Sequence, residues 1–115
     1  MNAVYRLYSK ENTTISKSIN IDDSLYEQLK KVIDKEFDAT ISQVVNVALE
    51  NYVNNDTCYY YAKPNGESVT YRSIMIRKEN LVALEGLHLS TGISFTRLIN
   101  SAIKYFLDDL KSNNL

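Results

Sequence analysis

The chain has 115 residues, of which 44% are hydrophobic and 23% are charged, and its formal net charge is -1. These values are typical of one small globular unit, and they show none of the basic excess that marks many nucleic-acid-binding proteins. One His, one Cys, three Gly and no Trp are too few for most metal sites, nucleophilic sites or Gly-rich phosphate loops. We therefore expect no enzyme, no catalytic residues, no metal and no cofactor.

The sequence has no signal for a membrane or for export. No apolar run approaches the ~20 residues of a membrane span, and Met1–Lys10 lacks the apolar core of a signal peptide. We therefore expect no membrane partner and a cytoplasmic location, or the host cell interior if the source is a virus.

The chain contains an internal repeat. A shift of 55 positions overlays Ser18–Ile21 on Ser73–Ile76, and a shift of 54 overlays Val44–Ala48 on Leu98–Ala102. The one-residue difference falls in the turn between two predicted helices, where a change of length costs little. The same features therefore occur twice in the same order.

We divide the chain into a first repeat, residues 1–57, and a second repeat, residues 58–115, which share one core. The first repeat has six basic and nine acidic side chains, net -3, and the second has seven basic and five acidic, net +2. The two repeats have therefore diverged in charge.

The first repeat is predicted to form a strand and two helices. Apolar and polar residues alternate over Ile15–Ile21, as in a half-buried strand. The apolar spacing over Leu25–Ile33 predicts a helix that Asp22 or Asp23 can cap. A second helix is predicted after the hydroxyl of Thr40.

The second repeat predicts the same order. A strand over Tyr71–Ile76 is followed by a helix from about Lys78 to Ser90 that Gly92 ends. Another helix is predicted after the hydroxyl of Ser94. His88 falls on the apolar stripe of its helix, so we expect it in the core or at its edge.

An aromatic stretch precedes each strand, at Val4–Tyr8 and at Tyr59–Ala62. Pro64–Gly66 is a good hairpin turn and follows the second stretch. Two interpretations are open. Each stretch adds a hairpin strand, or each is an ordered linker whose tyrosines cover the side of the core.

A strand and two helices within about 45 residues cannot bury their apolar faces alone. Found twice, this pattern resembles the ribbon–helix–helix family of DNA-binding proteins, which includes the Arc and methionine repressors. The residues that carry the resemblance are Ser16–Leu25 and Thr40–Leu49, and Tyr71–Glu79 and Ser94–Ile103. It implies a mainly α fold with short β strands, in which two ribbon–helix–helix units form an intramolecular pseudo-dimer around a two-stranded antiparallel ribbon.

The resemblance implies that this ribbon pairs Ser16–Asn20 with Tyr71–Met75 and enters the major groove of double-stranded DNA. The residues expected to read bases are Ser16, Ser18, Asn20, Tyr71, Ser73 and Met75. Asn20 suits adenine and Met75 suits the thymine methyl group, so an imperfect palindrome is expected.

Phosphates are expected at the start of the second helix of each repeat, where free N–H groups and the helix dipole favour an anion. Basic side chains around the ribbon add further contacts. The residues expected to bind phosphate are Lys17, Thr40, Ser42, Arg72, Arg77, Lys78, Ser94, Thr96 and Arg97.

The resemblance thus implies a sequence-specific transcription regulator that represses by occupying promoter DNA, with self-association of chains on neighbouring half-sites and no small-molecule ligand. Tandem members of the family from archaeal viruses and plasmids indicate a viral or plasmid source. The alternative is a protein-interaction module that does not bind DNA, either antitoxin-like or a degenerate ribbon–helix–helix adaptor. The near-neutral charge favours the adaptor.

Overall fold

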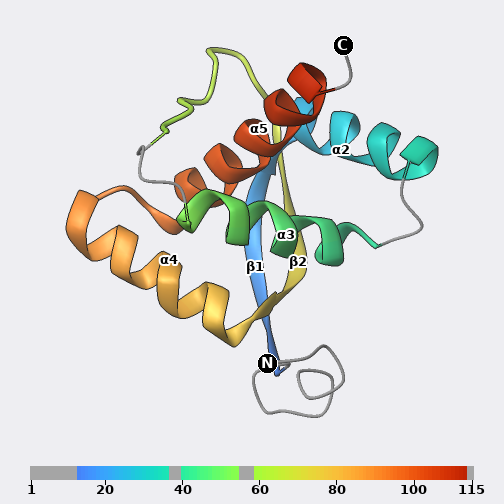
Figure 1. The fold of residues 1–115 in the computed structure, drawn as a ribbon. Helices are drawn as coiled ribbons and strands as arrows, with labels where there is room; N and C mark the ends of the chain where they lie inside the picture. The colour runs from blue at the N-terminus through green and yellow to red at the C-terminus, as the bar shows by residue number, and fades with distance from the viewer. Residues whose placement is uncertain (1–12, 37–39, 55–58, 114–115) are drawn as a thin grey trace.

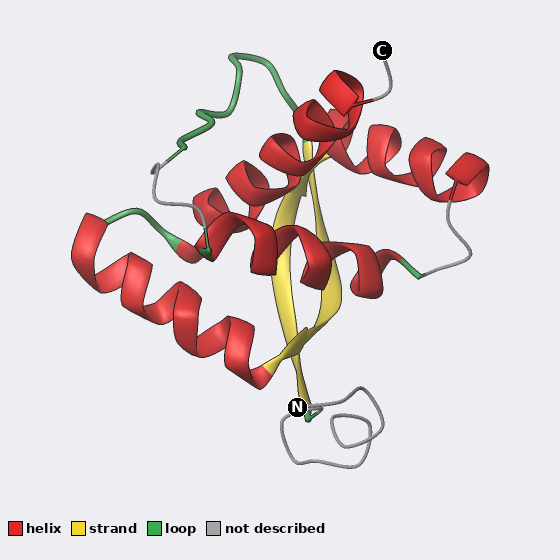
Figure 2. Ribbon diagram, in the orientation of Figure 1, coloured by secondary structure: helices red, strands yellow, loops and turns green. Residues whose placement is uncertain are grey.

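The computed structural model describes residues 13–36, 40–54 and 59–113. In this part of the chain a strand and two helices occur twice in the same order, as predicted (Figures 1 and 2). The elements are β1 (Thr14–Asp22), α2 (Asp23–Glu36), α3 (Ile41–Val53), β2 (Val69–Arg77), α4 (Lys78–Thr91) and α5 (Phe95–Asn113). The fold is a small compact α/β arrangement of these four helices with one two-stranded sheet.

β1 and β2 pair antiparallel along their whole length. The pairing places Ser16 opposite Met75 and Asn20 opposite Tyr71, so the predicted intramolecular pairing is confirmed. Ser18 and Ser73, which the repeat overlays on each other, lie opposite one another. Such a pair marks the centre of an approximate two-fold relation between the strands.

One face of the ribbon is packed against the helices, and α3 crosses in front of it in Figure 1. Ile19 and Ile21 of β1 and Ile74 and Ile76 of β2 are buried on this face. Ile15 is 37% exposed, so the buried part of β1 begins only beyond Lys17. The predicted alternation is confirmed over residues 18–21 of β1 and over residues 71–76 of β2.

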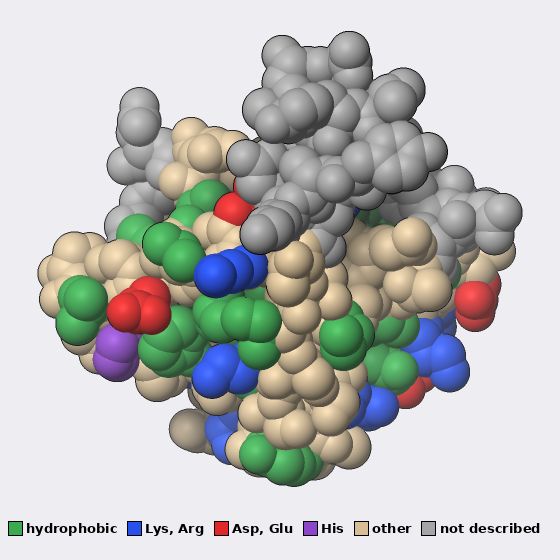
Figure 3. Space-filling view, turned by 90° about the horizontal axis from the view of Figure 1, so that it is seen from below, with side chains coloured by type: hydrophobic (Ala, Val, Ile, Leu, Met, Phe, Trp, Pro, Cys, Tyr) green, Lys and Arg blue, Asp and Glu red, His purple; other side chains and the backbone are tan. Residues whose placement is uncertain are grey.

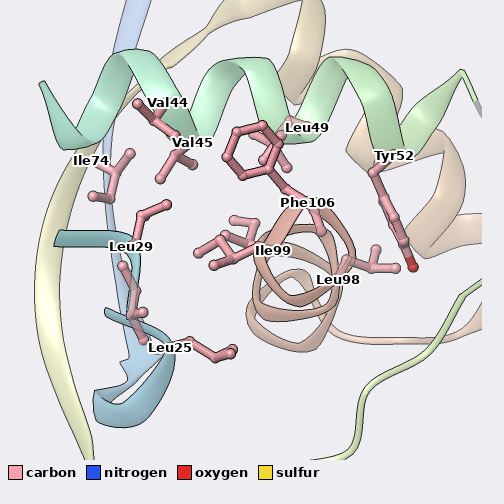
Figure 4. Packing of buried hydrophobic residues seen from close by; sticks show 14 of the residues in the cluster. Leu25, Leu29, Val44, Val45, Leu49, Tyr52, Ile74, Leu98, Ile99 and Phe106 are labelled. Atoms are coloured by element: carbon pink, nitrogen blue, oxygen red, sulfur yellow. The ribbon is translucent and has the colours of Figure 1, made fainter. Parts of the chain in front are cut away.

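The core is one cluster that takes residues from both repeats. α3 and α5 form its centre, where Leu49 and Ile103 are completely buried. Figure 4 shows Phe106 of α5 reaching toward α3, while Leu25 and Leu29 of α2 close the cluster on another side. The strands contribute the isoleucines of their inner face.

Three predicted helix ends are confirmed. The Thr40 Oγ1 accepts a hydrogen bond from the N–H of Gln43, whose side chain accepts from the Thr40 N–H in return. Ser94 Oγ accepts from the N–H of Arg97. Gly92 ends α4 with a left-handed φ of 77°, and its N–H donates to the carbonyl of His88. Glycine adopts this conformation without steric cost.

The start of α2 differs from the prediction. The N–H and hydroxyl of Ser24 donate to the Glu67 carboxylate, 3.2 and 2.6 Å away, in the loop before β2. The carboxylates of Asp22 and Asp23 do not cap this helix. Asp22 accepts from Arg97, and Asp23 accepts from the hydroxyls of Ser68, just before β2, and Thr70, in β2. The Glu67 carboxylate of the second repeat therefore accepts the hydrogen bonds at the first turn of α2.

Of the two interpretations of Tyr59–Ala62, the hairpin strand is wrong, because these residues form no strand. The N–H of Tyr61 donates to Ser101 Oγ of α5, 2.9 Å away, and Tyr59 and Tyr61 pack against the core. The linker interpretation is therefore confirmed for the second repeat. The stretch Val4–Tyr8 lies outside the described residues, as does Cys58.

The turn after this linker is formed as predicted, without serving a hairpin. The Glu67 N–H donates to the Pro64 carbonyl, 3.1 Å away, and Gly66 has a φ of 81°. His88 is half-buried with its Nδ1 2.7 Å from the Ile93 carbonyl oxygen and its ring centroid 5.0 Å from that of Phe95. It lies at the edge of the core, as expected.

Candidate nucleic-acid interface

The ribbon face that points away from the helices carries all six residues predicted to read bases, and all six are exposed. Tyr71 is 69% exposed and Met75 is 44% exposed. The residues form three cross-strand pairs: Ser16 with Met75, Ser18 with Ser73, and Asn20 with Tyr71. Two residues of a strand rise about 6.7 Å, so the three pairs span roughly 13 Å of ribbon.

The central pair is held by a hydrogen bond between Ser18 Oγ and Ser73 Oγ, 3.1 Å apart. The ends of the exposed face differ. One end has Ser16 beside Met75, and the other has Asn20 beside Tyr71. The ribbon is therefore symmetric in its backbone and unsymmetrical in its side chains.

α3 holds β2 through the buried side chain of Asn46. Its Nδ2 donates to the carbonyl oxygens of Met75, 2.8 Å away, and Ser42, 2.9 Å away. Its Oδ1 accepts from the N–H of Arg77 at 2.9 Å. A helix of the first repeat thus positions the strand of the second.

α5 holds β1 in the same way through Asn100. Its Nδ2 donates to the carbonyl oxygens of Asn20 and Thr96, 2.9 and 2.8 Å away, and its Oδ1 accepts from the N–H of Asp22 at 2.9 Å. These backbone partners occupy positions equivalent to those around Asn46. Asn46 Oδ1 also accepts from Asn80 Nδ2 at 3.0 Å, a contact without a counterpart because the equivalent residue of the first repeat is Leu25. Sequence reasoning assigned no role to these asparagines, although their repetition at a shift of 54 was a usable signal.

The start of α3 lies against the ribbon end that carries Met75. Ser42 Oγ accepts from the N–H of Met75, 3.0 Å away. A hollow of about 600 Å³ opens there, bordered by Thr14, Thr40, Ser42, Gln43, Asn46, Met75 and Arg77. Four residues predicted separately from the sequence, two from each repeat, are therefore brought together at one site.

The start of α5 lies at the other end of the ribbon. Ser94 caps the helix, and Thr96 is half-buried with its carbonyl bonded to Asn100. Lys17 is exposed, and its Nζ lies 6.0 Å from the ring centroid of Phe95, the first residue of α5. A positive charge therefore lies near this helix N-terminus.

The arginines predicted to bind phosphate are engaged by carboxylates within the protein. Arg97 lies 2.6 Å from the buried Asp22, and Arg77 lies 2.8 Å from Glu50. Arg97 also donates to the Tyr61 carbonyl at 3.2 Å. These carboxylates offset the positive charges of Arg77 and Arg97.

Arg72 is held between Tyr26 and Asp23. Its guanidinium carbon lies 3.4 Å from the Tyr26 ring centroid, and its Nη2 lies 3.7 Å from Asp23 Oδ1. Hydrogen bonds from Ser68 and Thr70 are the main reason why the pKa of Asp23 lies below its usual value, and Arg72 lowers the pKa further. Asp23 is therefore a stable anion beside the ribbon.

Of the cations predicted at the ribbon, Lys17 and Lys78 are exposed. On the face seen in Figure 3, Lys and Arg side chains are spread among hydrophobic and uncharged ones. Within the described residues no group of three or more His, Cys, Asp or Glu is arranged to hold a metal ion. The described helices also include none with the length and apolar character of a membrane span.

Comparisons of the chain with protein-family models, curated proteins and solved structures found no match.

Proposed function

We propose that this chain is a sequence-specific double-stranded DNA-binding transcription regulator, built as an intramolecular ribbon–helix–helix pseudo-dimer that reads the major groove with β1 and β2. The observation that carries the proposal is the outward ribbon face. Its six exposed side chains form three pairs around Ser18 and Ser73, on a backbone that Asn46 and Asn100 hold equivalently. A two-stranded ribbon fits the major groove, where every base pair presents a distinct pattern.

The two ends of the ribbon read different bases. Asn20 carries an amide that can bond both N6 and N7 of adenine, and Met75 can contact the methyl group of thymine. Ser18 and Ser73 contact the central base pairs through hydroxyls that donate or accept. The site is therefore an imperfect palindrome whose centre lies beneath the two serines.

Phosphates of the two strands bind at the starts of α3 and α5, where N–H groups and the helix dipole attract an anion. Lys17 and Lys78 are the exposed cations that add to this attraction. Arg72, Arg77 and Arg97 must exchange a carboxylate for a phosphate, so each adds less than a free arginine would. We expect a salt dependence shallower than that of a basic repressor, with a slope of about -0.9 for each phosphate contact.

Occupying promoter DNA would repress transcription without catalysis or a cofactor. The proposal is tested by selecting binding sites from a random duplex library and titrating the selected site at two salt concentrations. Asn20→Ala and Met75→Ala should relax specificity at different positions, each by about 1–3 kcal/mol for the base concerned. Asn51→Ala, an exposed asparagine on α3, is the matched control and should leave the selected motif unchanged. No enriched motif, with binding lost at physiological salt, would contradict the proposal.

The engagement of three arginines by carboxylates favours a second candidate, a protein-interaction module without DNA binding. Lys17→Gln with Lys78→Gln separates the candidates, because it removes exposed charge and leaves the buried contacts in place. A DNA-binding protein should bind all duplexes more weakly and lose about 1 unit of salt slope for each contact removed. An interaction module should be indifferent.

A further inference from the structure

α2 and α4 are equivalent helices with different outward faces. Val82 and Leu89 of α4 are 62% and 77% exposed. The equivalent positions of α2, 55 residues earlier, carry the exposed charges Glu27 and Asp34. α2 therefore shows the charged residues expected on the outer face of such a helix when that face contacts only water, and α4 lacks them at these two positions.

The apolar residues of α4 lie on both of its sides. Leu84 is completely buried in the core, while Val82 and Leu89 point outward two turns apart, a spacing of about 10.5 Å. Glu85 and Gly86 lie between them and are exposed.

Gly86 leaves open space at the middle of this face. A Cβ built at Gly86 would meet no atom within 4 Å, so packing within the chain does not require glycine there. Its backbone φ is not in the left-handed region either. Glycine weakens a helix interior, but it allows the backbone of another helix to approach closely.

We infer that the outer face of α4 binds the same face of a second copy of this chain, with the two α4 helices antiparallel across a two-fold axis. In this arrangement each Val82 lies against the partner's Leu89, and each Glu85 lies against the partner's Gly86. Apolar residues meet apolar residues, and the carboxylate meets the residue without a side chain. Because the residues of this face pair favourably with the same residues running in the opposite direction, a second copy of α4 is a better match for it than an unrelated helix.

The difference between α2 and α4 also predicts an assembly of two chains. A two-fold contact uses the same surface on both chains and is closed at two. The equivalent face on α2 carries Glu27 and Asp34, so α2 does not offer a second contact of this kind. One helix face is much smaller than the roughly 1,200–2,000 Å² of a stable complex, so the pair forms only at high protein concentration.

Sedimentation equilibrium of the full chain without DNA tests the inference. The mass should rise with concentration from the 13.2 kDa of one chain toward twice that value, and no further. Val82→Glu with Leu89→Asp gives α4 the residues of α2 and should hold the chain at one copy. Glu27→Gln with Asp34→Asn is the matched control on α2 and should dimerise like the unmodified chain. Glu27→Val with Asp34→Leu creates a second apolar face and should produce assemblies larger than two.

A chain that stays monomeric up to about 1 mM, or a dimer that survives Val82→Glu with Leu89→Asp, would overturn the inference. Far-UV circular dichroism of each variant establishes that it is folded, which these exposed sites should permit. Because no DNA is present, the outcome is independent of the proposed function. A chain that dimerises but selects no DNA would leave this inference in place and remove the other.

Discussion

The two repeats build the same backbone with different surfaces. Asn46 and Asn100 make equivalent hydrogen bonds to the backbones of β2 and β1. The helices that follow the strands differ in their outer faces, which are charged in α2 and apolar in α4. The buried polar contacts to the two strands are thus the same in both repeats, while the exposed positions of the helices have diverged.

The ion pairs beside the ribbon show the same divergence. Asp22 and Arg77 occupy equivalent positions at the ends of β1 and β2, yet they carry opposite charges. Each has acquired its own partner on the helix that covers it, Arg97 on α5 and Glu50 on α3. The ribbon thus has an acidic residue at one end and a basic one at the other.

The largest expected effect tests the equivalence of the two repeats. Asn46→Ala and Asn100→Ala should each lower the free energy of unfolding by about 3 kcal/mol, because each leaves buried backbone groups without partners. Urea denaturation of both variants measures the loss. Asn51→Ala should change stability by less than about 0.5 kcal/mol, since that side chain is exposed.

Asn46→Ala should cost at least as much as Asn100→Ala, because it also leaves the buried Asn80 amide without its acceptor. A clearly larger loss for Asn100→Ala would contradict the equivalence. If Asn100→Ala is severe and Asn46→Ala mild, the first repeat depends on other contacts to hold β2. The two asparagines share no partner, so the double variant should lose about the sum of the single losses.

A smaller effect distinguishes the two ion pairs. Asp22 is completely buried and Arg97 is 17% exposed, whereas Arg77 and Glu50 are both more than one-third exposed. Asp22→Asn leaves a largely buried guanidinium without its anion and should cost about 2 kcal/mol. Glu50→Gln should cost less than about 1 kcal/mol, because water screens an exposed pair. Equal losses in urea denaturation would mean that burial does not decide the difference.

The strand register was predictable from the sequence, and the contacts of Asp22 and Arg97 were not. The repeat aligns Ser18 with Ser73, and only one antiparallel register places these two residues opposite each other. This register and the alternation of each strand predict which residues point outward. Arg97 reaches Asp22 across 75 positions of sequence, and no local periodicity reports such a pair. The sequence left Tyr59–Ala62 open between a strand and a linker for a related reason, since β propensity does not reveal that Ser101 Oγ accepts from the N–H of Tyr61.

The smallest effect concerns Asp23, whose equivalent in the second repeat is Lys78. Asp23 accepts hydrogen bonds from Ser68 at 2.5 Å and Thr70 at 2.7 Å, and these bonds lower its pKa below the unfolded value of 3.8. A lowered carboxyl pKa stabilises the fold above pH 3.8, and this contribution is lost as the pH falls through the folded pKa.

Ser68→Ala with Thr70→Val should therefore be less stable than the unmodified chain at neutral pH, and the difference should shrink below pH 3.8. Urea denaturation across that range measures the difference. Lys78→Gln is the matched change at the equivalent position and should leave the acid limb of the stability curve unaltered, because a lysine does not titrate there. If the difference in the free energy of unfolding stays constant as the pH falls below 3.8, the loss comes from the packing of the two hydroxyls. The charge of Asp23 would then contribute nothing to it.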